Sequence, residues 1–216
     1  MPLRLLPMQE EDCETWMRVR AIAYRGPTNL IVHTSPLSEE SFTKVAEERR
    51  KEFHKPEYYR LKVVDTDSGE IIACAQWSVY PHGKTEAGSK DDGKPPYTPP
   101  EVNLPALKAL LGPLRGANIE IMGTRPYVML NTLTTLPEHQ RRGAASMLVQ
   151  WGVDKADEMG VETYLDSSII ARPLYERFGF EVVKEVIFDR TQWGGEGLDY
   201  HFCMLRKPHN HQVADV

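Results

Sequence analysis

The chain has 216 residues, enough for one sizeable α/β domain, and its 41% hydrophobic and 26% charged residues exclude a disordered chain. A formal net charge of −5 argues against a general nucleic-acid binder, which is normally basic. No apolar run approaches the ~20 residues that cross a bilayer, and the start of the chain turns acidic too soon for a signal peptide.

The cysteines indicate the compartment. Cys13, Cys74 and Cys203 are odd in number and lie too far apart for a metal site or a disulfide framework. We therefore expect buried thiols, a reducing compartment and no metal, and the protein is predicted to be cytoplasmic and to bind neither membranes nor nucleic acid.

The first half of the chain predicts a strand, two helices and a hairpin. Leu3 to Pro7 is a short apolar strand, and acidic residues then open a helix over 10–23. Ser38 is a natural N-cap for the second helix. The stripe of that helix consists of Phe42, Val45, Ala46, Arg49 and Phe53. Two β-rich runs, YYRLKVVD and EIIACAQWSVY, flank the turn sequence TDSG.

An insertion interrupts this pattern at about 81–126. Residues 81–100 are rich in Pro and Gly, which predicts a loop, either an active-site lid or an insertion without a role. Residues Leu104 to Leu114 predict a short amphipathic helix. The run YVMLNTLTTL then predicts the fourth strand.

The remaining elements alternate between strand and helix. A long helix is predicted from Ala144 to Met159, with Gly160 as its C′ residue. The runs TYLDSS, FEVVKEVIF and DYHFCMLRK predict strands, and ARPLYERF predicts a short helix. The sequence shows no internal repeat and no domain boundary, so we predict a single α/β domain over 1–216.

The sequence QRRGAA, which begins at Gln140, directly precedes the long helix. The first amides of a helix have no internal acceptor and carry the positive end of its dipole. Gly143 followed by two alanines would let a phosphate approach those amides. The sequence matches neither the Walker A nor the dinucleotide-binding pattern. The alternative is a surface turn, with Arg141 and Arg142 as solvated side chains.

Gln140 to Ala145 resembles the Gln/Arg-x-x-Gly-x-Gly/Ala signature of the GNAT superfamily of acyl-CoA-dependent N-acyltransferases. About thirty residues later, ARPLYERFGF resembles the family pattern A-x-x-L-Y-x-x-x-G-F, with Tyr175 at its tyrosine. The resemblance is close over 128–186, and the layout looks like a fungal-type branch with small-molecule or uncharacterised members. It implies the GNAT fold, a central mixed, mostly antiparallel twisted sheet flanked by helices, with the insertion between the third and fourth strands.

The resemblance also implies a binding site for acetyl-CoA as cosubstrate. Many members of the family have Asn where this chain has Ser168, and the acid that some place early in the fifth strand corresponds to about Thr163. The residues expected to contact the cosubstrate are Leu133, Thr134, Thr135, Gln140, Arg141, Arg142, Gly143, Ala144, Ala145, Ser146, Ser168 and Tyr175.

Two residues are candidates for the chemistry of acyl transfer. Tyr175 is the candidate acid, because a phenol is protonated at neutral pH and its pKa of ~10 lies near that of a thiol; the alternative is packing on the sheet. Asp166 is the candidate base for the amine, or else a cap carboxylate. Glu120 and His82 are weaker candidates for the base. Trp77 either lines the acceptor pocket or packs in the core.

These features together predict an N-acetyltransferase that transfers acetyl from acetyl-CoA to a primary amine of a small molecule by direct attack in a ternary complex. The alternatives are a non-catalytic CoA-binding or regulatory domain and a protein N-acetyltransferase. A nucleotide-binding kinase or ATPase would need a catalytic Lys and metal-binding carboxylates that the turn lacks. A homodimer remains open.

Overall fold

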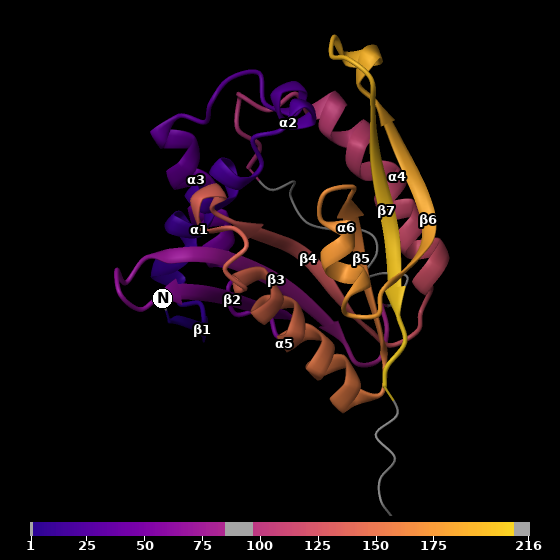
Figure 1. Ribbon diagram of the computed structural model, residues 1–216. Coiled ribbons are helices and arrows are strands. Elements are labelled where there is room, and N and C mark those ends of the chain that lie inside the picture. The colour runs from indigo at the N-terminus through magenta and orange to yellow at the C-terminus, as the bar shows by residue number, and fades with distance from the viewer. Residues whose placement is uncertain (1, 85–96, 210–216) are drawn as a thin grey trace, which may run out of the picture.

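The computed structural model describes residues 2–84 and 97–209, and its centre is one seven-stranded sheet (Figure 1). The strand order is β1-β2-β3-β4-β5-β7-β6, and every neighbouring pair is antiparallel except the parallel pair β4 and β5. The strands are β1 Leu3–Pro7, β2 Tyr58–Asp65, β3 Ile71–Tyr80, β4 Tyr127–Thr135, β5 Glu162–Ser168, β6 Glu181–Asp189 and β7 Leu198–Arg206. The helices are α1 Cys13–Ala23, α2 Pro27–Val32, α3 Glu39–Lys51, α4 Leu104–Met122, α5 Ala144–Met159 and α6 Arg172–Glu176, and short 3-10 turns cover Glu10–Asp12, Pro137–His139 and Arg190–Trp193.

The predicted mixed, mostly antiparallel sheet is confirmed, and two helices differ from the sequence prediction. Helix α2, which begins at Pro27, was not predicted because six residues are too few to show a helical period. Helix α4 was expected to end at Leu114 but continues to Met122, through Pro113. Its apolar side chains pack against β6 and β7, and this packing outweighs the low helix propensity of Gly and Pro.

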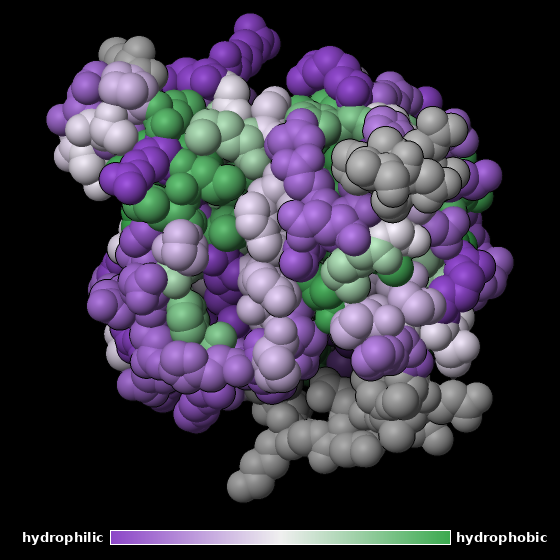
Figure 2. Space-filling view, turned by 90° about the horizontal axis from the view of Figure 1, so that it is seen from below, coloured by the Kyte–Doolittle hydropathy of each residue, from purple (hydrophilic) through white to green (hydrophobic). Residues whose placement is uncertain are grey.

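Helices cover both faces of the sheet (Figure 1). Helix α5 packs across β1 to β5 on one face, which we call the α5 face. Helix α1 packs on β3 and β4 from the opposite side, with α3 against α1, and α4 covers β6 and β7. We call this opposite side the α1 face. Figure 2 shows the molecule from below, where hydrophobic residues form separate patches among hydrophilic ones.

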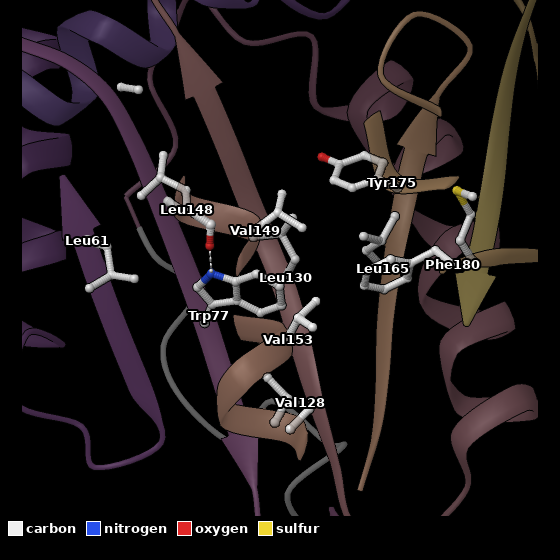
Figure 3. Packing of buried hydrophobic residues seen from close by; sticks show 14 of the residues in the cluster. Leu61, Trp77, Val128, Leu130, Leu148, Val149, Val153, Leu165, Tyr175 and Phe180 are labelled. Atoms are coloured by element: carbon white, nitrogen blue, oxygen red, sulfur yellow. Dashed lines mark hydrogen bonds between the residues drawn. The ribbon is translucent and has the colours of Figure 1, made fainter. Parts of the chain in front are cut away.

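The contact between α5 and the sheet depends on a glycine and a tryptophan. Trp77 of β3 is fully buried, and its indole Nε1 donates to the Leu148 carbonyl at 3.1 Å (Figure 3). The ring lies directly under Gly152, where an added Cβ would come within 2.2 Å of it. Trp77 therefore packs in the core, which decides between the two roles considered for it. The three cysteines are free and buried, as expected.

Replacing Gly152 by alanine is expected to destabilise the protein. Forcing α5 away from Trp77 costs about 1–3 kcal/mol, more than the ~1 kcal/mol that alanine gains in helix propensity. Gly116→Ala is the matched control, because Gly116 is an exposed glycine in α4 with nothing within 4 Å of the added methyl. In thermal unfolding, Gly152→Ala should melt several degrees below the wild type and Gly116→Ala at or above it. A Gly152→Ala protein as stable as the wild type would contradict this packing.

Candidate active site

A gap opens in the sheet where β4 and β5 separate. The two strands pair from Tyr127 and Glu162 to Leu130 and Leu165, and no further β4–β5 pair occurs within the described residues. Beyond that point β5 stays paired with β7, and β4 stays paired with β3. Residues 131–135 of β4 therefore have one edge without a neighbouring strand, and alternate backbone groups point into the gap.

A β-bulge lies at the start of this gap. Leu130 pairs with Trp77 and Thr132 pairs with Gln76, so Asn131 is the extra residue. Ser78 Oγ donates to Asn131 Oδ1 at 2.7 Å. After the bulge, Leu133 packs toward the α5 face, whereas Thr134 donates to the Cys74 carbonyl at 3.4 Å. The three strand residues predicted to contact the cosubstrate all lie along the open edge: Leu133, Thr134 and Thr135.

The turn before α5 has an unusual backbone. Gly143, the N-cap residue, has φ +95°, and Arg141 is the one non-glycine residue with positive φ (61°) in the described chain. No backbone acceptor is found in the described structure for the amides of Gly143, Ala144 and Ala145, and Gly143 offers no side-chain cap. The turn thus presents helix N-terminal amides on a strained backbone, an arrangement suited to an anion.

A partly buried ion pair holds this turn against the β2–β3 hairpin. Arg142 Nη2 lies 2.7 Å from Asp65 Oδ2, and Arg142 Nη1 lies 2.5 Å from Nδ1 of His139. His139 Nε2 is in turn 3.3 Å from Glu70 Oε2, at the other end of the hairpin turn. The Arg142 guanidinium beside Asp65 lowers the pKa of that carboxyl group, with further help from the Asp67 amide. The guanidinium of Arg142 thus anchors the turn, while Arg141 is exposed.

Tyr175 lies on the α5 face with its hydroxyl toward the gap. Its ring packs edge-on against Phe180, with centroids 6.0 Å apart, and Figure 3 shows the phenol oxygen pointing toward β4. Burial raises the pKa of Tyr175 above its usual value, and the nearby Tyr24 adds to the shift. The phenol is therefore a weaker acid than the ordinary pKa used in the sequence argument, and it stays protonated at neutral pH.

Asp166 lies at the other side of the gap, on the α1 face. It follows Leu165, the last residue of β5 paired with β4, and its Oδ1 accepts from the Tyr164 hydroxyl at 2.8 Å. Burial raises the pKa of Asp166, although hydrogen bonds from Tyr164 and Cys203 oppose the shift. Asp166 caps no helix; instead Ser168 Oγ accepts from the Ala171 amide at the start of α6.

The weaker candidates for the base do not gather at the gap. Glu120 is exposed and forms an ion pair with Lys184, and His82 is exposed after β3. Part of the predicted loop, residues 85–96, lies outside the described residues. His201 of β7, which the sequence argument missed, lies near Asp166, and its Nε2 is 3.4 Å from Asp199 Oδ2.

A cavity that was not predicted from the sequence lies beside the bulge. Its volume is about 150 Å³, and it opens on the α1 face. Its lining residues are Trp16, Arg20, Arg49, Gln76, Asn131 and Thr132. The sequence did hold a signal, because Arg49 falls within the apolar stripe of its helix, and an arginine in such a stripe points inward.

Within 2–84 and 97–209, no cluster of His, Cys, Asp and Glu side chains is arranged to hold a metal ion. The same part of the chain contains no helix of the length and apolarity that a membrane span requires.

The sequence matches the profile of the acetyltransferase (GNAT) family over residues 28–180. A curated relative, the uncharacterised N-acetyltransferase YafP of Escherichia coli K12, is 43% identical over 72 residues, which are 33% of this chain. The match spans 43% of the relative's length, so it covers less than half of that protein. This relative is bacterial, and nothing in the comparisons supports a fungal-type branch.

Solved structures share the fold at low sequence identity. Arylalkylamine N-acetyltransferase 2 from Aedes aegypti superposes with a TM-score of 0.68 at 12% identity, covering 97% of this chain and 100% of its own. A polyamine N-acetyltransferase of Drosophila melanogaster that forms N-acetylagmatine gives a TM-score of 0.61 at 12% identity, covering 95% and 100%.

Replacing Asp65 by asparagine should weaken the anchor of the turn in a pH-dependent way. The folded-state pKa of Asp65 is lowered, so its contribution is fully present above the unfolded value of ~3.9 and is lost as the pH falls through the lower folded value. Asp65→Asn should therefore melt below the wild type at pH 7, and the two melting temperatures should converge under acid.

Asp67→Asn is the matched control, since Asp67 lies in the same turn and its side chain makes no ion pair among the described residues. It should melt like the wild type at every pH. A constant difference between Asp65→Asn and the wild type down to strongly acidic pH would rule out the ion pair.

Proposed function

The chain belongs to the acetyltransferase (GNAT) family and is an N-acetyltransferase by class, and we propose that it transfers acetyl from acetyl-CoA to a primary amine of a small molecule. We further propose one cytoplasmic domain over 1–216 with an insertion at about 81–126. The observation that carries the proposal is the turn from Gln140 to Ala145, in which the amides of Gly143, Ala144 and Ala145 lack backbone acceptors in the described structure.

This turn fits the diphosphate of acetyl-CoA. The amides of Gly143, Ala144 and Ala145 would donate to the phosphate oxygens, and the helix dipole favours negative charge there. Arg141 is exposed beside them and would add a positive charge. The side chains of Gln140 and Ser146 flank the same turn, and the anchor from Arg142 to Asp65 keeps it in place.

The open edge of β4 fits the rest of the cosubstrate. Backbone groups of residues 133–135 would pair with the amide groups of the pantetheine arm, in place of the missing strand. An amide near the bulge would donate to the thioester carbonyl oxygen, where negative charge develops during transfer. Ser168, the last residue of β5, would make a weaker contact with the cosubstrate.

Tyr175 and Asp166 divide the proton chemistry between the two faces of the sheet. Tyr175, whose phenol burial keeps protonated, would donate its proton to the departing thiolate to give free CoA, and would regain a proton from solvent. Asp166 would accept a proton from the amine directly or through water, and burial makes it a stronger base than an exposed carboxylate. The amine nitrogen then attacks the thioester carbon, the C–S bond breaks, and the acetyl group passes directly to the amine.

Two structural neighbours are named for small amines, arylalkylamines and a product of agmatine, which supports a small acceptor here. A non-catalytic CoA-binding domain would keep the turn without the proton chemistry. A protein N-acetyltransferase would prefer peptides. Thiol release from acetyl-CoA with panels of small amines and peptides separates these alternatives.

Replacing Gly143 by alanine should weaken CoA binding in addition to lowering the thermal stability of the protein. The φ of +95° strains any residue with a Cβ by about 1–3 kcal/mol, and the methyl group would shift the amides that face the phosphates. Gly160→Ala is the matched control, because Gly160 is also left-handed (φ 64°) and in open space, at the far end of α5.

Both variants should lose thermal stability, but only Gly143→Ala should lose the stabilisation that CoA confers on the folded protein, measured by thermal shift and calorimetry. Equal CoA affinity in the two variants would place the diphosphate elsewhere.

Replacing Tyr175 by phenylalanine should slow transfer while leaving CoA binding close to that of the wild type. General acid catalysis contributes about 10²–10⁴-fold, so thiol release should fall by at least about 100-fold at saturating acetyl-CoA. Tyr24→Phe is the matched control, because it removes a phenol that lies near Tyr175. Unchanged turnover in Tyr175→Phe would remove Tyr175 from the acid role.

A further inference from the structure

The cavity beside the β4 bulge is built from charged and polar side chains. Helix α1 contributes Trp16 and Arg20, α3 contributes Arg49, and the strands contribute Gln76, Asn131 and Thr132. At about 150 Å³ it is smaller than the ~300–1,000 Å³ pockets that enclose drug-sized ligands, so it suits one end of a small molecule.

Three lining residues carry buried polar atoms without a partner. They are Trp16 Nε1, Arg20 Nε and Thr132 Oγ1, each with no hydrogen bond in the described structure. Trp16 itself is 2% exposed. A buried donor without an acceptor is costly, and in native structures such a group usually meets a water molecule or a ligand. Two of the three are obligatory donors, so the group that fits here is an acceptor.

The cavity is also positively charged. Arg20 and Arg49 lie close enough for the charge of Arg20 to lower the pKa of Arg49, after the larger effect of burial. Glu52 is the one carboxylate of the described chain at ion-pair distance from either guanidinium, with its Oε2 3.5 Å from Arg49 Nη1. Its Oε1 is engaged by Lys55 at 2.8 Å. The two guanidinium groups that line the cavity therefore have one nearby carboxylate among the described residues, and it pairs with Arg49 and not with Arg20.

We propose that this cavity binds the carboxylate of the acceptor, and that the acceptor is therefore an amino acid. The inference rests on the proposed function. A guanidinium group donates two parallel hydrogen bonds to a carboxylate, and the unpartnered donors of Arg20 and Trp16 supply further contacts. Asn131 and Thr132 line the cavity and also begin the open edge of β4. The amine would then lie a few bonds from the carboxylate, next to the strand that would hold the thioester.

The direct test compares each amino acid with its own amide as acceptor. The two molecules have nearly the same size, and only the amino acid carries the anion. Thiol release from acetyl-CoA gives kcat/KM for a panel of such pairs, with an aminoalkylphosphonate and a short peptide added. Charge-assisted hydrogen bonds are worth ~1.5–3 kcal/mol, so amino acids should exceed their amides about ten- to a hundred-fold.

Arginine variants locate the preference in the cavity. Arg20→Gln and Arg49→Gln should each reduce the ratio of amino acid to amide by about tenfold or more, chiefly through KM for the amino acid, with the KM for acetyl-CoA unchanged. Arg50→Gln is the matched control, because Arg50 neighbours Arg49 on α3 and does not line the cavity. A melting curve checks that each variant folds. The comparison of amino acids with their amides in the wild-type protein tests the inference even if a variant does not fold.

The remaining outcomes test either the carboxylate site or the proposed function. Amides that react as well as their amino acids, or a peptide that reacts faster than both, overturn the inference, and a preferred phosphonate overturns the carboxylate assignment. No thiol release with any acceptor refutes the proposed function instead. The cavity is then tested by thermal shift with the same pairs: stabilisation by amino acids alone, lost in Arg20→Gln, keeps the carboxylate site, and no stabilisation removes it.

Discussion

Strand β4 keeps its ladder with β3 along its whole length but loses its ladder with β5 after Leu130. This separation matters for the candidate site, because a strand edge inside a covered sheet leaves backbone donors and acceptors that need a partner. The bulge at Asn131 begins the open edge, Tyr175 approaches it from the α5 face, and Asp166 lies on the α1 face. The site is thus a break in the ladder between two covered faces.

The turn proposed to bind the diphosphate depends on contacts distant in sequence. The positive φ of Gly143 is local, but the position of the turn relative to the sheet comes from the pair of Arg142 and Asp65, residues 77 apart in the chain. The same hairpin turn holds His139 through Glu70. Trp77 under Gly152 then fixes the helix that follows. Strands β2 and β3 consequently fix the position of the turn relative to the open strand edge.

Much of the fold follows from local patterns in the sequence. Some elements are predicted because their conformation depends on local residues alone. Examples are the turn sequence TDSG, the alternating strands and the glycines that flank α5. The extent of α4 was not predictable, since Pro113 argues for a break and only packing against distant strands sustains the helix. Likewise, the ion pair of Arg142 with Asp65 was not predictable, since the two residues are 77 apart in the chain. The charged cavity is lined by residues of two helices and two strands, so no single segment of the sequence predicts it.

We propose that the amides at the start of α5 hold the diphosphate of acetyl-CoA while the edge of β4 holds its acyl arm. A crystal structure of the complex with acetyl-CoA is the decisive measurement. We expect phosphate oxygens within hydrogen-bond distance of the amides of Gly143 to Ala145, and the thioester beside the bulge at Asn131. A ligand bound at any other place, with these amides facing water, would contradict it.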